Sequence, residues 1–304
     1  MSGATMGEDR RDLFGYGGKP PKVGWPGGAK VAVSFVINNE EGGEYAVGDG
    51  DHRNELVHEA IDDVGPLPDL CTESHFAYGT RAAWWRIAGV FDRFGAKPTV
   101  SSCGRAVERS PWLAQDAVAR GYEVSCHGWR WERHAGMEEA AEREAIARTY
   151  DTIAEVCGVP PVGWHTRSAS SLDTRRLLVE HGGFLYDSDA YDDDLPYFKM
   201  VAGRRHLVLP YAFDTNDMRF RPGSAFVSGD DFSSYVLAAF DWLAGEADEA
   251  PRMMSVGLHL RTIGRPARIG GLQAILQGLA ERGTGWIARR DEIARHWIAN
   301  APGG

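Results

Sequence analysis

The segment "SCHGWRW", residues 125–131, places His127 four residues before Trp131. Two histidines at that spacing lie on one face of a helix and can bind the same metal ion. Indole offers no ligand atom, and His134 lies about 10 Å from His127 along a helix. Cys126 would point to the opposite face of a strand from His127, which disfavours a Cys–His nucleophile pair. The segment alone leaves open a metal site, an altered metal site or no site.

The stretch "VINNEEGGE", residues 36–44, offers a second set of reactive groups. In an extended chain Asn38 and Glu40 point to one side, and Asn39 and Glu41 point to the other. If Glu40 lies over an enclosed site, we expect burial to raise its pKa and allow it to act as a general base. The alternative is an acidic loop in water that ends at two glycines.

Further polar residues follow apolar segments along the chain. They are His127, His165, Arg167, Asp187, Asp189, Asp214, Asn216, Asp217, His259 and Arg261. In a parallel barrel the carboxyl ends of the strands meet at one rim, so we expect these side chains to converge there.

The elements that would position them alternate between β-branched or aromatic segments and helical patterns, which is typical of parallel strands with crossover helices. The expected strands cover residues 30–37, 97–102, 122–127, 161–166, 183–188, 206–211, 253–260 and 285–290. The expected helices cover residues 110–121, 137–158, 171–183 and 270–283. About eight strands in this order favour an irregular α/β barrel of the TIM type over an open doubly wound sheet.

We expect a single domain over residues 1–304, with residues 1–29 as an N-terminal extension and residues 45–78 as a long loop over one rim.

Composition restricts the class of partner. A formal net charge of −10 disfavours nucleic acids and anionic membranes. The four cysteines form no C-x-x-C pair, and no nucleotide-binding or serine-hydrolase motif occurs. The acidic stretch "YDSDAYDDDLPY", residues 186–197, lacks the ligand alternation of a calcium loop and favours a solvated or capping role. With no apolar leader or membrane-length run, we expect a cytoplasmic protein with a small-molecule substrate.

Taken in order, these segments resemble the polysaccharide deacetylase superfamily, and within it the branch of cofactor-independent allantoinases. The resemblance covers nearly the whole chain and rests on "NNEEGGE", "YGTRAAWWR", "SCHGWRW", "GGFLYDSDAYDDDLPY", "DTNDMRF" and "LHLRTIGRP". It implies an irregular TIM-like barrel of the polysaccharide deacetylase type and a homotetramer.

The superfamily pattern has a catalytic aspartate, a metal-binding aspartate and a His-x-x-x-His pair. Carried onto this chain, the aspartates fall at Asn38 and Glu40 and the histidines at His127 and Trp131. The resemblance therefore implies a site that has lost its metal. It also implies that His259 takes part in catalysis and that Asp187 lies beside the site.

At the fourth expected strand this chain departs from the allantoinases, which have a Tyr-Thr-Gly-Arg version of "GWHTRSASSLD". His165 takes the first place, and Arg167 sits one residue earlier than the allantoinase arginine. Either residue is a candidate for contacting a substrate carbonyl or oxyanion, and the change leaves a different substrate open.

The leading functional prediction is a metal-independent amidohydrolase that opens the hydantoin ring of allantoin to give allantoate. Glu40 and His127 are the alternative bases, and Asn38 and His259 complete the expected catalytic set. The expected substrate-binding residues are Trp131, Arg167, His165, Arg81, Asp187 and Asp217, and Arg167, Arg81 and backbone N–H groups are the candidate oxyanion donors.

Two alternatives remain. A metal-dependent de-N-acetylase acting on polysaccharide or peptidoglycan would need zinc, for which Glu40 and His127 supply two ligands. A non-catalytic barrel that binds a small molecule is the other.

Overall fold

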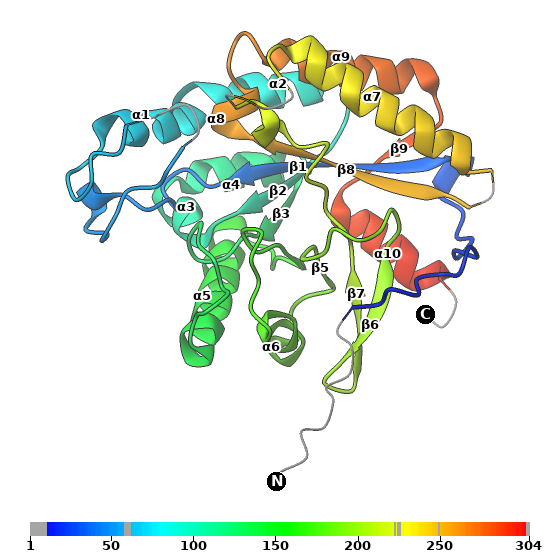
Figure 1. Cartoon of the computed structure of the whole chain (residues 1–304), viewed down its shortest axis with the longest axis horizontal. Coiled ribbons are helices and arrows are strands. Elements are labelled where there is room, and N and C mark those ends of the chain that lie inside the picture. Colours follow the sequence, from blue (N-terminus) through cyan, green and yellow to red (C-terminus); the bar gives the residue numbers. More distant parts are fainter. Residues whose placement is uncertain (1–10, 58–61, 222, 224–225, 249, 302–304) are drawn as a thin grey trace.

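The computed structural model describes residues 11–57, 62–221, 223, 226–248 and 250–301 (Figure 1). The strands are β1 (Val31–Asn39), β2 (Thr99–Ser102), β3 (Glu123–Cys126), β4 (Gly163–Trp164), β5 (Tyr186–Asp187), β6 (Tyr197–Val201), β7 (Arg204–Val208), β8 (Arg252–His259) and β9 (Gly285–Ile287). The α-helices are α1 (Leu70–Tyr78), α2 (Trp84–Phe94), α3 (Gly104–Arg109), α4 (Pro111–Ala119), α5 (Glu139–Cys157), α6 (Thr174–His181), α7 (Gly229–Glu246), α8 (Leu260–Ile263), α9 (Ile269–Arg282) and α10 (Arg290–Asn300). A π-helical turn, Gly79–Ala83, joins α1 to α2, and 3₁₀ turns cover Pro26–Gly28, Val47–Asp49 and Asp217–Arg219.

The strands form one curled sheet in the order β6-β7-β5-β4-β3-β2-β1-β8, with β9 also paired to β1. The strand pairs are parallel except β6 and β7, which form an antiparallel hairpin. Helices cover the outside of this half-barrel (Figure 1). The predicted class, an irregular α/β barrel, is therefore confirmed.

Burial explains why β1 reads as a nearly continuous apolar run. All nine of its residues are buried, as expected for a parallel strand covered on both faces. The main core lies between the sheet and the outer helices, and includes Phe35, Trp84, Phe91, Leu113, Ile146, Phe232 and Leu276. This core fixes β1 and thereby the residues at its carboxyl end.

A second apolar cluster packs α10 against the N-terminal segment. Val23 and Trp25 are buried there with Trp297, and the Trp25 indole donates a hydrogen bond to the Arg252 carbonyl at 2.7 Å. The part of the predicted extension from residue 20 onward is thus packed on the barrel. Residues 1–10 lie outside the described residues.

The rim segment 45–78 is not a loop throughout. Its last nine residues form α1, where the Asp69 side chain accepts the Thr72 N–H and caps the helix. Residues 58–61 lie outside the described residues. The expected elements did not include β6, α3, α7, α8 or α10, and β4 and β5 are only two residues long.

The half-barrel has a seam beside β8. Among the described residues β8 pairs with β1 on one side, and its other edge faces residues 194–217. The N–H groups of Met253 and Gly257 donate to the carbonyls of Asp194 and Thr215, and the Ser255 carbonyl accepts the Thr215 hydroxyl. Loop and side-chain hydrogen bonds thus close the barrel where a strand pair would.

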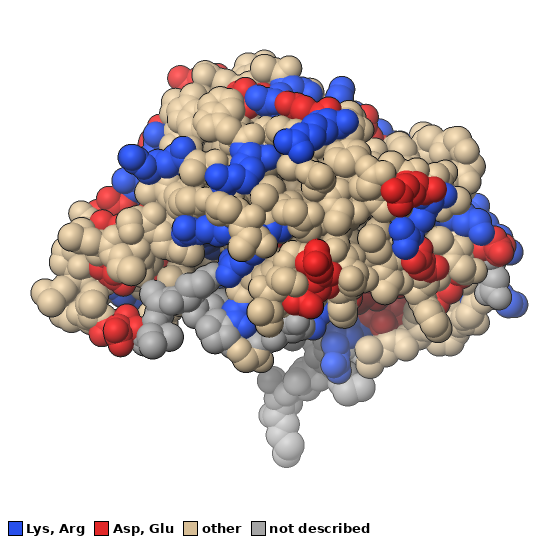
Figure 2. Space-filling model, turned by 90° about the horizontal axis from the view of Figure 1, so that it is seen from above, with Lys and Arg blue, Asp and Glu red and all other residues tan. Residues whose placement is uncertain are grey.

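The outer face formed by α7 and α9 carries basic and acidic side chains side by side (Figure 2). One such pair joins the helices, with Arg282 Nη2 2.7 Å from Asp241 Oδ2. Within the described part of the chain, no helix is long and apolar enough to cross a membrane.

Candidate active site

A cavity of about 420 Å³ opens at the carboxyl ends of the strands. It is lined by Asn38, Glu40, His127, Trp131, Arg133, Ala135, His165, Arg167, Ser168, Ala169, Tyr211, Phe213, Asn216, Met218 and His259. The structure thus brings together residues that lie at, or just after, the carboxyl ends of β1, β3, β4, β7 and β8. Asn38, Glu40, His127, Trp131, His165, Arg167 and His259, all predicted site residues, line this cavity.

Glu40 lies at the centre of the charged wall and its side chain is only 1% exposed. Its Oε1 atom lies 3.3 Å from His127 Nε2 and 3.4 Å from His259 Nε2, while Oε2 lies 2.8 Å from Arg261 Nη2. Burial alone would raise the pKa of Glu40, but the Arg261 and His259 charges and the two imidazole hydrogen bonds hold it well below its usual value. The predicted rise in this pKa is therefore wrong, and Glu40 is a carboxylate.

Asp217 fixes the position of His259 through two hydrogen bonds. The Nδ1 atom of His259 lies 2.7 Å from Asp217 Oδ1, and the backbone N–H of His259 donates to Asp217 Oδ2 at 2.8 Å. Burial opposes protonation of the imidazole, but the Glu40 and Asp217 carboxylates raise the pKa of His259 to about 9. His259 is therefore an imidazolium near neutral pH, with Nε2–H directed at Glu40.

His127 has its tautomer set by a backbone carbonyl. Its Nδ1 atom lies 2.6 Å from the carbonyl oxygen of His165, which accepts hydrogen bonds only, so Nδ1 carries a proton. This leaves Nε2 facing Glu40 and the cavity.

Arg261 follows the seventh expected strand and was not among the predicted catalytic or substrate-binding residues. It begins α8 together with Leu260 and lies behind the cavity wall, where it pairs with Glu40 and, at 3.5 Å, with Glu41. Burial raises the pKa of Glu41 to about 7, with Arg261 opposing the rise. The only signal in the sequence was its position two residues after His259.

The Trp131 ring forms an aromatic wall of the cavity and contacts two arginine side chains. The Arg167 guanidinium lies 3.5 Å from the centre of the Trp131 ring, and Arg261 lies 5.0 Å from it. Arg167 also makes two 2.8 Å contacts with the Glu55 carboxylate and donates to the Trp131 carbonyl. The rim segment that carries Glu55 is thus tied to this wall.

Another part of the cavity wall, formed by Asn38, His165 and Tyr211, carries no charge. Asn38 Nδ2 donates to the Tyr211 hydroxyl and to the Leu258 carbonyl, both at 3.1 Å. The His165 ring stacks on His127 at 4.9 Å and lies 4.4 Å from the Tyr211 ring. Burial and the nearby His127 and Arg290 hold the pKa of His165 well below its usual value, so this imidazole is neutral.

Two buried polar atoms of the neutral wall have no hydrogen-bond partner among the described residues. They are Asn38 Oδ1 and His165 Nδ1. Buried polar groups are nearly always paired in folded proteins, so unpaired ones that line a cavity are suited to meet a ligand.

Three of the predicted substrate-binding residues do not line this cavity. Arg81 is exposed on the π-helical turn and does not line the cavity. Asp187 is buried behind the wall, where it binds the Arg175 guanidinium at 2.6 and 2.9 Å and His206 at 2.9 Å. Asp217 contacts His259 and does not line the cavity.

The donor set does not fit zinc. Arg261 already neutralises Glu40, protonated His259 has no free lone pair, and Trp131 supplies no ligand atom. Among the described residues, no group of three or more His, Cys, Asp or Glu side chains is placed to hold a metal ion.

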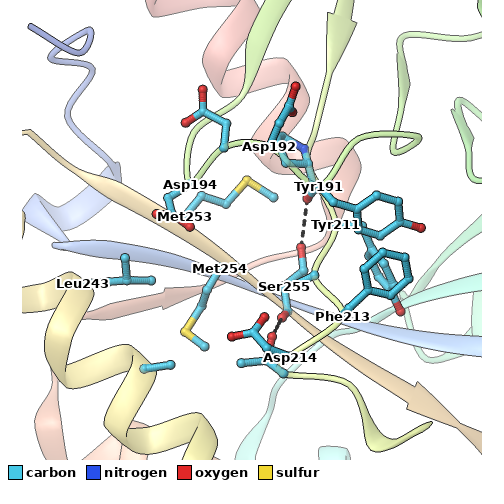
Figure 3. Close-up of a pocket in the computed structure, with 15 residues that line it drawn as sticks. Tyr191, Asp192, Asp194, Tyr211, Phe213, Asp214, Leu243, Met253, Met254 and Ser255 are labelled. Carbon is cyan, nitrogen blue, oxygen red and sulfur yellow. Dashed lines mark hydrogen bonds between the residues drawn. The ribbon is translucent and has the colours of Figure 1, made fainter. Parts of the chain in front are cut away.

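A second cavity, of about 450 Å³, lies in the seam beside β8 (Figure 3). Its acidic residues include Asp192 and Asp193. Asp192 accepts the Tyr197 hydroxyl, and Asp193 accepts the Tyr16 hydroxyl and the Leu195 N–H. These carboxylates therefore cap local groups, as the capping interpretation predicts. Tyr211 and Phe213 line both cavities and separate them.

Comparisons with known proteins agree with this geometry. Residues 66–186 match the family model for polysaccharide deacetylase. A Schizosaccharomyces pombe (strain 972 / ATCC 24843) protein described as "Putative polysaccharide deacetylase" is 35% identical over 97% of this chain and 98% of its own.

Two solved structures are similar over nearly their whole length. The crystal structure of Puue allantoinase has 43% identity and a TM-score of 0.92, and covers 96% of this chain and 98% of its own. The crystal structure of a probable polysaccharide deacetylase from Pseudomonas aeruginosa PAO1 has 43% identity and a TM-score of 0.91 with the same coverage. With this identity sustained along the chain, the protein belongs to the polysaccharide deacetylase family and is a hydrolase of that family's amide-cleaving type.

Proposed function

We propose that this protein hydrolyses the hydantoin ring of allantoin to allantoate without a metal ion. The observation that carries the proposal is the position of Glu40, whose Oε1 atom lies within 3.4 Å of both His127 Nε2 and His259 Nε2 in the cavity. This arrangement offers one imidazole to remove a proton and a second to donate one. The likeness to Puue allantoinase over 96% of the chain supports the choice of substrate.

His127 is the proposed general base. The base is the neutral form of His127, in which Nδ1 keeps its proton on the His165 carbonyl while Nε2 leaves its hydrogen bond to Glu40 and receives a proton from the attacking water. Glu40 is a poor proton acceptor because its pKa is held low, but its negative charge stabilises the imidazolium that forms on His127. Glu40 therefore orients the water and balances charge.

His259 is the proposed general acid. As water attacks the ring carbonyl, a C–O bond forms and the carbonyl oxygen becomes an oxyanion beside the His259 imidazolium. When the ring C–N bond breaks, His259 gives its Nε2 proton to the departing nitrogen. The proton taken by His127 and the proton given by His259 balance, and Asp217 keeps His259 charged until the transfer.

The remaining walls are proposed to bind the flat ring. Trp131 offers an aromatic face, and Arg167 holds that face in place. Asn38 Oδ1 and His165 Nδ1, the two unpaired buried atoms, are suited to the N–H and C=O groups of a neutral ureide. Arg167 itself is bound to Glu55, so its main proposed role is to position the wall.

The test is to incubate chelator-treated protein with allantoin and to measure allantoate over many turnovers. We expect full activity after chelation and no gain on adding zinc. Folded, chelator-treated protein that makes no allantoate would overturn the proposal. Activity that appears only with added zinc, especially on N-acetylated sugar oligomers, would support the metal-dependent deacetylase instead.

Three further expectations stay part of this proposal, namely one catalytic domain over residues 1–304, a homotetramer and a cytoplasmic location. Sedimentation or light scattering of the purified chain measures the second, and fractionation of the source cells measures the third.

A further inference from the structure

Arg290 is a fully buried arginine in the interior of the barrel, with 2% of its surface exposed. It begins α10, where its N–H donates to Thr99 Oγ1 and the next N–H, of Asp291, donates to Glu123 Oε2. These two acceptors lie at the starts of β2 and β3. The backbone of Arg290 is therefore anchored at the amino end of the sheet, opposite the active-site rim.

The Arg290 side chain reaches the seam beside β8. Its Nε donates to Ser188 Oγ at 3.0 Å, which follows β5, and Nη1 donates to Ser255 Oγ at 2.8 Å, which lies in β8. Its Nη2 donates to the carbonyls of Leu209 and Pro210, which follow β7. One guanidinium thus connects both sides of the gap where strands do not pair.

None of these acceptors is a carboxylate. Burying a charge without an opposite charge is costly, and an apolar residue would fill the interior without that cost. The planar guanidinium can, however, hold acceptors in several directions at fixed angles, which a lysine ammonium cannot do. The geometry therefore favours a positioning role over a role in packing.

The segment that Arg290 holds leads directly to the active site. Pro210 precedes Tyr211, and the Ser255 hydroxyl also donates to the Pro210 carbonyl at 3.1 Å. The Tyr211 hydroxyl accepts from Asn38 Nδ2 at 3.1 Å, and the Tyr211 ring lies 4.4 Å from His165. Tyr211 is therefore the link between the buried guanidinium and the neutral wall of the cavity.

We propose that Arg290 is a positioning residue, which braces the unpaired seam so that Tyr211 holds Asn38 and His165 in place for the substrate. The catalytic consequence rests on the proposed function, whereas the effect on Tyr211 does not. Small displacements of positioning groups reduce enzyme rates by about a hundredfold.

The test compares Arg290→Lys with Arg289→Lys. The control removes the neighbouring guanidinium, which lies outside the cavity and binds Asp291 and the Gly121 carbonyl. Two readouts are needed. One is the ¹⁹F spectrum of protein labelled with fluorotyrosine, in which Tyr211→Phe assigns the Tyr211 signal. The other is kcat and KM per folded molecule at a temperature well below the unfolding transition.

We expect Arg290→Lys to shift or broaden the Tyr211 signal and to lower kcat/KM at least tenfold, on the order of the effects of misplaced groups. Arg289→Lys should leave both readouts unchanged within about twofold, because the contacts of Arg289 lie outside the cavity. A folded Arg290→Lys protein with an unchanged Tyr211 signal overturns the proposal. So does a protein whose unfolding temperature falls while kcat and KM per folded molecule stay at parent values, because the role is then structural only.

If Arg290→Lys does not fold, Ser188→Ala removes one acceptor of the guanidinium, and Ser34→Ala is its control. The Ser34 hydroxyl is buried and has no partner among the described residues. The Tyr211 signal should move in Ser188→Ala and not in Ser34→Ala. An unchanged signal in Ser188→Ala, or an equal shift in both variants, overturns the proposal. If the parent protein does not hydrolyse allantoin, the proposed function fails while the Tyr211 signal still decides the role of Arg290.

Discussion

Asp217 holds His259 through both of its carboxylate oxygens, one on the imidazole Nδ1 at 2.7 Å and one on the backbone N–H at 2.8 Å. This contact fixes the direction of the ring and, together with Glu40, raises the pKa of His259 to about 9. A side chain that does not line the cavity therefore sets the charge of one that does.

The first prediction concerns the alkaline limit of activity. If the His259 imidazolium is the general acid, kcat/KM should fall as the pH rises through about 9. Asp217→Asn removes one of the charges that raise this pKa, so the alkaline limb should move to lower pH, and kcat/KM at pH 8 should drop by about tenfold or more. The measurement is kcat/KM against pH for both proteins. An alkaline limb at the same pH in both would contradict the role of Asp217.

The same pKa shift affects stability. A folded-state pKa raised from about 6.5 to about 9 contributes stability that is fully present below pH 6.5 and is lost as the pH rises through 9. Urea unfolding across that pH window should show a decline in the parent that is smaller in Asp217→Asn.

The second prediction is that Glu40→Gln abolishes most activity and leaves the fold intact. The substitution removes the negative charge that faces two imidazoles, so kcat should fall by about a hundredfold or more. Glu132→Gln is the control, since Glu132 accepts a hydrogen bond from Tyr45 and does not line the cavity. Initial rates with allantoin measure both. Near-parent activity of Glu40→Gln would exclude the proposed chemistry.

The third prediction concerns Glu55 and tests whether its contact with Arg167 affects substrate binding or the chemical step. Glu55→Gln replaces the carboxylate that holds Arg167 against Trp131. Because this contact positions a wall and touches no reacting atom, we expect KM to rise by about fivefold or more and kcat to change by less than about twofold. Glu73→Gln, in α1 of the same rim segment, should change neither. A loss confined to kcat would show that Arg167 acts in the transition state.

The fourth prediction concerns metal binding. Trp131→His restores a histidine four residues after His127, yet we expect weak zinc binding because Arg261 still neutralises Glu40 at 2.8 Å. Trp131→His combined with Arg261→Met should bind zinc at least tenfold more tightly, on the order of one removed repulsive charge. Isothermal titration with zinc measures both proteins. Tight zinc binding by the single variant would show that Arg261 is not the obstacle.

The fifth prediction concerns backbone strain in the cavity wall. Ser168 lines the cavity with φ of 48°, in the left-handed region that glycine adopts without strain. Ser168→Gly should raise the free energy of unfolding by about 1 kcal/mol, the cost of this conformation for a residue with a side chain. Urea unfolding measures the change, and Ala202→Gly, at φ of 49° in the β6–β7 turn, should behave alike. Destabilisation by Ser168→Gly would show that its side chain contributes more than its backbone costs.

The fold class could be predicted from the sequence because strands and helices each have a characteristic spacing of apolar residues, which can be recognised locally. It also predicted which polar residues meet at the rim, since the ends of parallel strands converge whatever the loops do. Asn38, Glu40, His127, His165 and His259 all reached one cavity for this reason.

The charge states of Glu40 and His259 could not be predicted from the sequence, because they depend on contacts that only the folded chain makes. The pKa of Glu40 falls because Arg261 lies 2.8 Å away in space, although it follows Glu40 by more than two hundred residues. Burial of Glu40 was predictable, but this cation was not. Arg290 was missed for a similar reason, because the acceptors of its guanidinium, in Ser188, Pro210 and Ser255, lie far from it in the sequence.

Arg81 and Asp187 lie outside the cavity because of the directions of their side chains. Arg81 is exposed on the π-helical turn Gly79–Ala83. Asp187 is at the end of β5 as expected, but its carboxylate turns to Arg175 and His206 on the side away from the cavity.

The edge of β8 that faces residues 194–217 has a consequence for association between molecules. Along that edge the backbone groups of Met253, Ser255, Gly257 and His259 are all engaged, by the carbonyls of Asp194 and Thr215, the Thr215 hydroxyl and the Asp217 carboxylate. An unpaired strand edge is a template on which another chain can add a strand and start aggregation. Here every second residue of the edge already makes a hydrogen bond to residues 194–217, so this edge offers no free template on which a neighbouring molecule could add a strand.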